Sequence, residues 1–308
     1  MSDSPVLLPI MVIGDLMLDV SENGDANRLS PEAPVVILQN PVATRSLGGA
    51  GNTAANTLSL GHPAIVVGAV GNDVDGEHCV NLISASGLES AVSRSDQIVT
   101  TVKTRFLARS HQIMRLDRET SDVPEQCRDQ FMASLELHAH RIGALVISDY
   151  DKGAISERFA ARAIAMARDA GIPVVVDSKK TAVRCFEGCT VIAPNHHEAL
   201  RITGTADPER AAALIADQTR SAVLVTLGAD GMLIFDEHGP HHIPSNARDV
   251  ADVTGAGDTV TAALAVALAE GATVREAAIW ANWAAAEAVA HSGTYAVPRA
   301  AIAVTLGG

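Results

Sequence analysis

The chain alternates short runs of β-branched residues with longer alanine-rich stretches, and this rhythm constrains its fold more than any other feature. Runs that are apolar throughout are typical of strands buried on both faces, and the helical stretches between them supply the crossovers that parallel strands require. The pattern therefore predicts an α/β fold with one parallel sheet covered by helices on both faces. The predicted strands are 10–13, 64–70, 144–148, 174–177, 191–193, 222–226 and 232–235, and the predicted helices lie near 52–60, 123–141, 157–170, 208–219, 257–269 and 274–291.

Two further segments, 21–45 and 98–117, break this rhythm because charged residues alternate with apolar ones along them. A period of two is typical of strands with one solvent-facing side. We therefore expect a small β-sheet lid inserted in the larger body. With 308 residues and 47% apolar content the chain can bury a sizeable core, and it shows no linker or internal repeat, so residues 1–308 are predicted to form one domain.

The charge balance excludes some classes of partner. A formal net charge of −13 argues against nucleic acid, which requires a concentrated basic face. The segment from Met1 to Pro9 has no basic region leading into a long apolar run, and other apolar runs end well short of a membrane span, so we expect a cytoplasmic protein with no membrane partner. Four cysteines are interpreted as reduced, buried thiols: Cys79, Cys127, Cys185 and Cys189.

The stretch Asp252-Val253-Thr254-Gly255-Ala256-Gly257-Asp258 has the composition of an anion site. Its glycines let the backbone approach an anion closely, and the helix that follows directs free N–H groups toward it. Asp258, held ionised by the helix dipole, could accept a proton from an attacking hydroxyl during phosphoryl transfer from a nucleotide. An ordinary N-capped helix after a glycine turn is the alternative.

Acidic residues follow three predicted strands, at Asp15, Asp149 and Asp177. The carboxyl ends of strands form the ligand crevice of an open α/β sheet, so these carboxylates, with Asp19 nearby, are candidates for binding sugar hydroxyls. An N-cap for the next helix is the alternative for each.

A substrate phosphate would need a local basic pocket in so acidic a chain. Basic side chains near the strand ends are candidates for that contact, although lysines and arginines are commonly solvated surface residues. These candidates are Lys179, Lys152 and Arg28.

A second glycine-rich entry to a helix is Gly48-Gly49-Ala50-Gly51-Asn52. Gly48 and Gly49 let the backbone run close to a ligand, and the Asn52 amide can donate and accept at once, which suits a sugar hydroxyl. A tight turn with an asparagine cap fits equally well.

Two segments are candidates for a nucleotide site. Asn195 and Glu198, three residues apart on one helical face, can hold Mg²⁺ and its waters beside phosphates, although a capping box accounts for the same pair. The turn from Thr226 to Gly231 joins a predicted strand to an antiparallel neighbour and can press its backbone against a nucleotide. A hairpin without a ligand is the alternative.

Together these segments resemble the ribokinase family, also called the PfkB carbohydrate kinases. Residues 48–71 match the N-terminal signature of that family and residues 252–265 its C-terminal signature, in the order that the family has. The resemblance implies a ribokinase-like three-layer α/β/α sandwich with a small β-sheet lid, a homodimer formed through that lid, and ATP-dependent phosphorylation of a carbohydrate.

The same resemblance implies roles for the candidate residues. Asp258 would be the catalytic base, and the anion hole would be formed by Gly255, Ala256 and Gly257. Mg²⁺ would be assisted through water by Asn195 and Glu198, and a monovalent cation such as K⁺ would lie near Asp252. The nucleotide site would further include Thr226, Gly228, Gly231 and Asn282.

A narrower resemblance, to the kinase module of the heptose phosphate enzymes that make ADP-heptose, extends over nearly the whole chain. Its marks are Gly14-Asp15 with Met17-Leu18-Asp19, residues 28–35 in the lid, Lys103-Thr104-Arg105 with Arg115-Leu116-Asp117, and residues 148–153. It implies phosphoryl transfer from ATP to O1 of D-glycero-D-manno-heptose 7-phosphate. The nucleotidyltransferase half of bifunctional relatives is not in this sequence, so a separate enzyme would supply that step.

Other functions remain open at this point. A kinase for another sugar or sugar phosphate, of the fructose 6-phosphate or ribose type, would share both broad signatures. A non-catalytic sugar or nucleotide sensor on the same fold is the alternative from another class, although a sensor has no need of a base at Asp258. A structural oligomer without a ligand leaves the glycines and acids at the strand ends unexplained.

Overall fold

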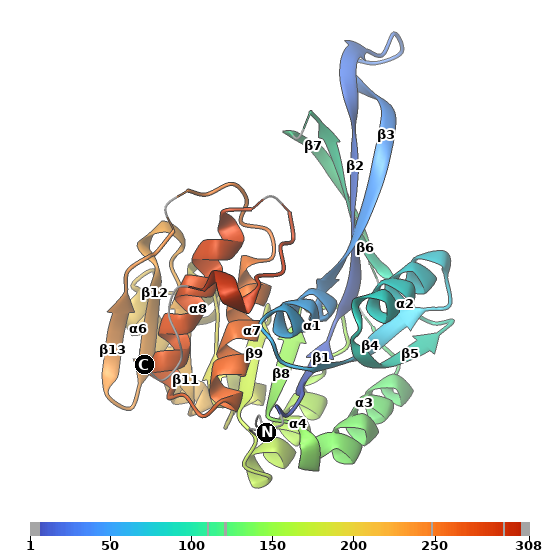
Figure 1. Cartoon of the computed structure of the whole chain (residues 1–308). Coiled ribbons are helices and arrows are strands. Elements are labelled where there is room, and N and C mark those ends of the chain that lie inside the picture. Colours follow the sequence, from blue (N-terminus) through green and yellow to red (C-terminus); the bar gives the residue numbers. More distant parts are fainter. Residues whose placement is uncertain (1–6, 110, 120–121, 248, 292, 303–308) are drawn as a thin grey trace, which may run out of the picture.

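The computed structural model describes residues 7–109, 111–119, 122–247, 249–291 and 293–302, so Met1 to Val6 of the N-terminal segment lie outside it. A nine-stranded sheet forms the centre of the body (Figure 1), in the order β13-β12-β11-β10-β9-β8-β1-β4-β5. All neighbours are parallel except at the β12 and β13 edge. The strands are β1 (Ile10–Gly14), β4 (Ala64–Gly71), β5 (Glu89–Ser95), β8 (Ala144–Asp149), β9 (Val174–Ser178), β10 (Val191–Ile192), β11 (Ala222–Thr226), β12 (Met232–Asp236) and β13 (Gly239–Ile243).

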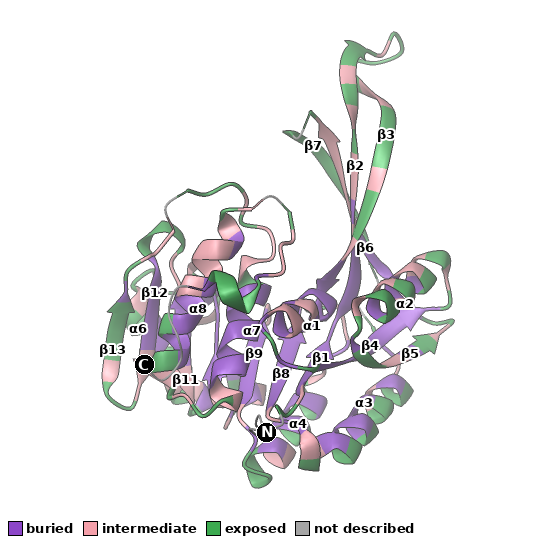
Figure 2. Ribbon diagram, in the orientation of Figure 1, coloured by how far each residue is buried: buried purple, intermediate pink, exposed green. Residues whose placement is uncertain are grey.

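Helices cover both faces of this sheet, which confirms the three-layer α/β prediction. Successive side chains of a strand point to opposite faces, so Ile10 and Val12 join one apolar core while Met11 and Ile13 join the other. Figure 2 shows the resulting buried strands between half-buried helices. The first core is completed by α1 (Ala50–Ser59), α2 (Val74–Ser86), α7 (Ala256–Ala269) and α8 (Val274–Val289), and the second by α3 (Glu125–His138), α4 (Glu157–Asp169), α5 (His196–Thr203) and α6 (Pro208–Thr219).

A separate four-stranded sheet projects from the body as the lid (Figure 1). Its strands are, in order, β3 (Val36–Gly49), β2 (Leu16–Leu29), β6 (Thr101–Ala108) and β7 (His111–Arg118). β2 begins at Leu16 and β3 ends at Gly49, so both strands extend further toward the body than the predicted segment 21–45. Leu18 and Val20 pack there with Val102 and with Leu82 of α2 in a small core at the base of the lid. This contact joins the lid to the body.

Every predicted strand and helix is present with small changes at its ends, but the predicted ranges did not include α2, α5, β5 or β13. Helix α2 contains Gly76 and deeply buries few other side chains, chiefly Cys79 and Ile83, so its apolar period is weak. Its start depends on the Asp73 side chain, which accepts a hydrogen bond from the Gly76 N–H at 2.7 Å. The cysteine interpretation also needs one correction, since Cys185 is only half-buried. Within the described ranges, no helix combines the length and apolar character needed to cross a bilayer.

Candidate active site

Asp258 lies in the first turn of α7 and is held by donors from two other elements. Asn52 Nδ2 donates to Oδ2 at 2.7 Å, and Thr53 Oγ1 donates to Oδ1 at 3.0 Å. Both donors belong to α1, whose glycine-rich start turns the chain at Gly49. Tyr150 directly follows β8, and its hydroxyl donates to Oδ1 of Asp258 at 2.8 Å. Three donors therefore orient this carboxylate at the carboxyl end of the sheet.

Burial changes the acidity of Asp258. Loss of hydration raises the pKa of the carboxyl from 3.8 to about 6, hydrogen bonds from Asn52 and Tyr150 oppose that rise, and the charge of Asp177 adds to it. This corrects the expectation that the helix dipole alone keeps Asp258 readily ionised, because burial dominates. A carboxylate with a pKa near 6 is still largely ionised at neutral pH and is a better proton acceptor than an exposed aspartate.

No side chain caps the start of α7, where the Ala256 N–H donates to the Val253 carbonyl oxygen at 3.3 Å. Gly255 has φ 78° and forms no side-chain cap, so N–H groups of the first turn lack the partner that a capping side chain would supply. A Cβ at Gly255 would lie 2.9 Å from Asn52 Nδ2, next to the contact that holds Asp258. Glycine at 255 thus serves both the left-handed backbone and the packing of Asn52 against the base.

A cavity of about 860 Å³ begins at Ala256 and Gly257 and extends along the carboxyl end of β11. Its volume is in the range of small-molecule sites. Gly231, with φ 91°, closes one wall, and a Cβ there would approach Ser245 N to 2.5 Å. The candidate nucleotide residues that line the cavity are Asn195, Thr226, Gly228, Gly231 and Asn282, together with apolar walls from Val253, Val260 and Val289.

Asn195 and Glu198 form the capping box that was the alternative interpretation of this pair. The Glu198 N–H donates to Asn195 Oδ1 at 2.9 Å, and the Asn195 N–H donates to Glu198 Oε2 at 2.8 Å. The other Glu198 oxygen lies 2.9 Å from Lys179 Nζ, which also contacts Asp177 Oδ1 at 2.8 Å. Burial would lower the pKa of Lys179, but the two carboxylates outweigh it and raise the pKa. Lys179 is therefore charged and already bound to two anions.

Asp252 joins the loop before α7 to the segment after α8. Its Oδ1 accepts from the Thr254 N–H at 2.9 Å and from Thr254 Oγ1 at 2.7 Å, and its Oδ2 accepts from the Gly293 N–H at 2.9 Å. Although burial opposes ionisation, these hydrogen bonds lower the pKa of Asp252. The charge needed to attract a monovalent cation is thus present near this loop.

Asp15 and Asp149, which were predicted to bind sugar hydroxyls, make internal contacts in the free protein. The Asp15 carboxylate accepts from the backbone N–H groups of Tyr150, Lys152 and Ala154 at 2.7, 3.1 and 3.0 Å. Asp149 is fully buried and lies 2.8 Å from Lys180 Nζ. Because neighbouring donors occupy both carboxylates, they hold the loop after β8 in place.

The remaining candidates divide between the outer lid and the region between the inner lid and Asp258, which is called the cleft below. Asp19 and Gly48 lie in the cleft, where the missing Cβ of Gly48 leaves room for the Asp19 carboxylate and its ion pair with Arg105. Lys152 lies there too, with its Nζ 2.8 Å from Glu119. Arg28 does not join them, because it is exposed and lies about 30 Å further along β2 than Asp19.

Three residues of the cleft received no role from sequence reasoning: Tyr150, Thr53 and Lys103. Tyr150 follows a strand-end aspartate, which was the available signal. Lys103 lies on β6 with its Nζ 5.1 Å from the centroid of the Tyr150 ring, and Lys179 lies 5.2 Å from the same centroid. Only the packing of α1 and the lid onto the loop after β8 brings these groups together.

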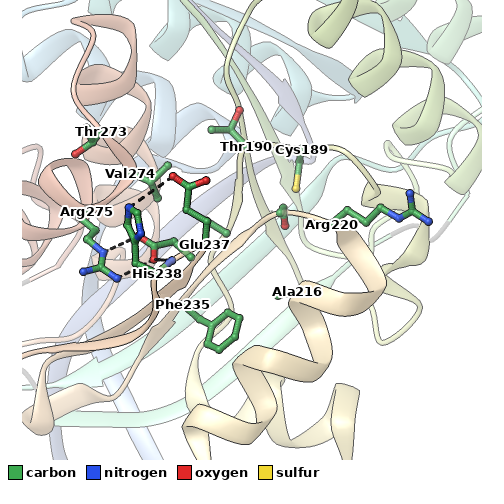
Figure 3. Close-up of a pocket in the computed structure, with 13 residues that line it drawn as sticks. Cys189, Thr190, Ala216, Arg220, Phe235, Glu237, His238, Thr273, Val274 and Arg275 are labelled. Carbon is green, nitrogen blue, oxygen red and sulfur yellow. Dashed lines mark hydrogen bonds and ion pairs between the residues drawn. The ribbon is translucent and has the colours of Figure 1, made fainter.

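A second cavity, of about 650 Å³, lies at the opposite ends of the same strands (Figure 3), near the start of β11 and of α8. Its arginines are neutralised by neighbours: Arg275 binds Asp236 at 2.6 and 2.8 Å, and Arg220 lies 3.1 Å from Glu187. It shares no lining residue with the first cavity and contains none of the candidate residues. The chemistry is therefore concentrated around Asp258.

Comparisons with known proteins agree with this geometry. Residues 8–300 match the model of the pfkB family carbohydrate kinases. The bifunctional protein HldE of Caulobacter sp. (strain K31) is 41% identical over 294 residues, which cover 92% of this chain and 60% of that protein. HldE of Geobacter metallireducens is 39% identical over 306 residues, covering 96% of this chain and 62% of that protein. This chain thus spans less than two thirds of the length of these relatives.

Solved structures show the same fold at low identity. Ribokinase of Arabidopsis thaliana, complexed with ribose and ATP, has a TM-score of 0.76 and 23% identity, covering 96% of this chain and 98% of that one. Phosphofructokinase-2 of Escherichia coli, in complex with potassium, has a TM-score of 0.77 and 22% identity, covering 96% of this chain and 97% of that one. These likenesses confirm the ribokinase-like α/β fold.

Proposed function

This chain belongs to the pfkB family of carbohydrate kinases and is an ATP-dependent carbohydrate kinase, and from that premise we propose its substrate and mechanism. We infer that it transfers the γ-phosphoryl group of ATP to O1 of D-glycero-D-manno-heptose 7-phosphate and forms the 1,7-bisphosphate. The observation that carries the proposal is the position of Asp258, in contact with α1 and Tyr150 on one side and beside the cavity at Ala256 and Gly257 on the other. An enzyme that uses ATP also fits the expected cytoplasmic location.

In the proposed mechanism, Asp258 accepts the proton of the acceptor hydroxyl as that oxygen attacks the γ-phosphorus. The proton passes to the carboxylate and the phosphoryl bond to ADP breaks. N–H groups at Gly255, Ala256 and Gly257 stabilise charge on the transferred oxygens. The lid covers the acceptor and limits access of water, so that hydrolysis of ATP does not compete.

The residues around the cavity fit a Mg²⁺ ion held mainly by the nucleotide. Within the described part of the chain, no three His, Cys, Asp or Glu side chains are grouped as a metal site. Asn195 and Glu198 would assist through water, because Lys179 and the helix start already bind Glu198. When bound, Mg²⁺ supplies positive charge to the β- and γ-phosphates. The ionised Asp252 would attract K⁺ to the loop that precedes α7.

The identity of the acceptor is tested by a substrate panel. The motif at 28–35 and relatives named HldE over nine tenths of the chain support heptose 7-phosphate. We expect ADP release with MgATP and KCl to be fastest with heptose 7-phosphate, compared with free heptose, fructose 6-phosphate, ribose and fructose. Preference for another sugar would keep the kinase mechanism and overturn the heptose proposal, and ATP binding without turnover would favour the sensor.

We also propose that a second copy of this chain covers the outer face of the lid. Phe106 pairs with Met114 across β6 and β7, and both share the face of Val20 and Leu116, which points away from Asp19. Met114 and Leu116 are 52% and 54% exposed, which is costly for apolar side chains in a monomer. A dimer through this surface would bury them.

Replacing Met114 with aspartate is expected to convert the dimer to a monomer, because a charge would then be buried at the interface. The measurement is the mass of each protein by sedimentation equilibrium. Val74→Asp is the matched control, since Val74 is 73% exposed on the body and outside this surface. A monomeric parent protein, or a Met114→Asp variant that remains dimeric, would contradict the proposed interface.

A further inference from the structure

Four residues form a straight row across the inner face of the lid. The register places Ser46 opposite Asp19, Asp19 opposite Lys103, and Lys103 opposite Asp117. Residues opposite one another in neighbouring strands share a face. This face points toward the base, because the Lys103 ammonium lies over the ring of Tyr150, whose hydroxyl donates to Asp258.

Most cations of this face are bound to a carboxylate. Arg105 pairs with Asp19, and Arg115 contacts Asp117 through two hydrogen bonds of 2.8 and 3.0 Å. The other cations at the cleft are paired as well, Lys152 with Glu119, Lys179 with Asp177 and Glu198, and Lys180 with Asp149. Across the described residues, Lys103 has no carboxylate within ion-pair distance, and its contact is the Tyr150 ring.

A half-buried ammonium without an anion is energetically unfavourable in the free enzyme. Burial lowers the pKa of Lys103, Asp19 and Asp117 oppose that change, and Arg115 and Lys152 add to it. The carboxylates of Asp19 and Asp117 are already engaged by arginines. An incoming phosphate would supply the missing negative charge.

The position of Lys103 relative to Asp258 defines the ligand. One tyrosine ring separates the two groups, since the ring lies under the ammonium and its hydroxyl touches the carboxylate. A hydroxyl at the base and an anion at Lys103 can therefore belong to one molecule of sugar size. Such a molecule has its phosphate several bonds away from the attacking hydroxyl.

We propose that Lys103 binds the phosphate of a phosphorylated acceptor sugar and so selects sugar phosphates over free sugars. The inference rests on the proposed kinase function and adds the phosphate contact, for which Lys179, Lys152 and Arg28 were the sequence candidates. Lys103 is the better candidate because it alone among these cleft lysines brings a charge that no carboxylate neutralises.

The test compares Lys103→Met with Lys103→Arg, which keeps the charge. For heptose 7-phosphate we expect Lys103→Met to raise KM by about 10-fold to 100-fold, the range expected for loss of one hydrogen bond to a charged group. The KM for ATP and the rate with free heptose should stay within about twofold, because neither ligand has a phosphate at this position. Lys103→Arg should recover much of the lost affinity.

The matched control is Arg118→Gln. Arg118 lies opposite Val102 on the other face of the same strand pair and binds Asp75, 2.6 Å away. The Arg118→Gln variant should leave the KM for heptose 7-phosphate unchanged. A KM within twofold of the parent enzyme in Lys103→Met, with the parent active on heptose 7-phosphate, would overturn the phosphate contact alone. If the parent prefers another sugar phosphate, the same comparison applies with that sugar, whereas preference for a free sugar would overturn both proposals.

Discussion

Replacing Asp258 with asparagine is expected to lower kcat by about 10²-fold to 10⁴-fold, the contribution of a positioned general base. Asparagine keeps the shape of the side chain, and the hydroxyls of Thr53 and Tyr150 can rotate to accept a hydrogen bond from its amide. The KM for ATP should change little, because Asp258 does not line the cavity proposed for the nucleotide. Steady-state kinetics and calorimetric binding of ATP measure both quantities. Near-normal turnover would rule out the base assignment.

The same carboxyl predicts how stability and rate depend on pH. In the folded state its pKa is raised to about 6 from 3.8, so the ionised form destabilises the fold above pH 6, and this cost disappears as the pH falls to 3.8. Asp258→Asn should therefore be at least as stable as the parent at pH 7. The rate of the parent should rise with pH as the base loses its proton, reach half its maximum near pH 6 and level off above that.

Tyr150→Phe provides a companion variant for this prediction. It removes one donor that lowers the pKa of Asp258 while the ring remains under Lys103. We expect the acidic limb of the pH–rate profile to move to higher pH, in addition to a lower kcat. An unchanged limb would show that the tyrosine hydroxyl does not act on the base.

Replacing Gly14 with alanine is expected to lower the free energy of unfolding by about 3 kcal/mol, the upper range for inserting a methyl group into a packed interior. Gly14 pairs with Ser148 across the central strands β1 and β8, and a Cβ would lie 2.7 Å from the Ser148 carbonyl carbon and would overlap its oxygen. Further strands flank both, so the pair cannot separate freely. Urea unfolding at equilibrium gives the free energy.

Activity should also fall in Gly14→Ala, because the next residue, Asp15, anchors the N–H group of Tyr150 at 2.7 Å. Gly87→Ala is the control: Gly87 has φ 81° at the end of α2, but open space surrounds its missing Cβ. That variant measures backbone strain alone, which costs about 1 kcal/mol. If Gly14→Ala is no less stable than this control, the proposed clash between β1 and β8 is wrong.

Local patterns in the sequence determined the layers of the fold and marked Asp258 as the candidate base. Continuous apolar runs predicted the strands of the central sheet, since such runs are stable where both faces are buried. The glycines at 255 and 257 marked the start of α7 because the left-handed backbone at 255 has a recognisable residue preference. Helix α2 and the edge strand β5 were not predicted from the sequence, because they bury few apolar side chains and so have a weak apolar pattern.

Only the tertiary structure decided which charges remain available in the site. Asp15, Asp149 and Lys179 have the residue types of ligand contacts, and in the free protein each of them also binds groups from other segments of the chain. The pKa of Asp258 and the unpaired charge of Lys103 likewise depend on burial and on contacts between β6, α1 and the loop after β8. Sequence patterns report each residue's own backbone and side chain, whereas electrostatic interactions and desolvation are set by whatever the fold places within a few ångströms.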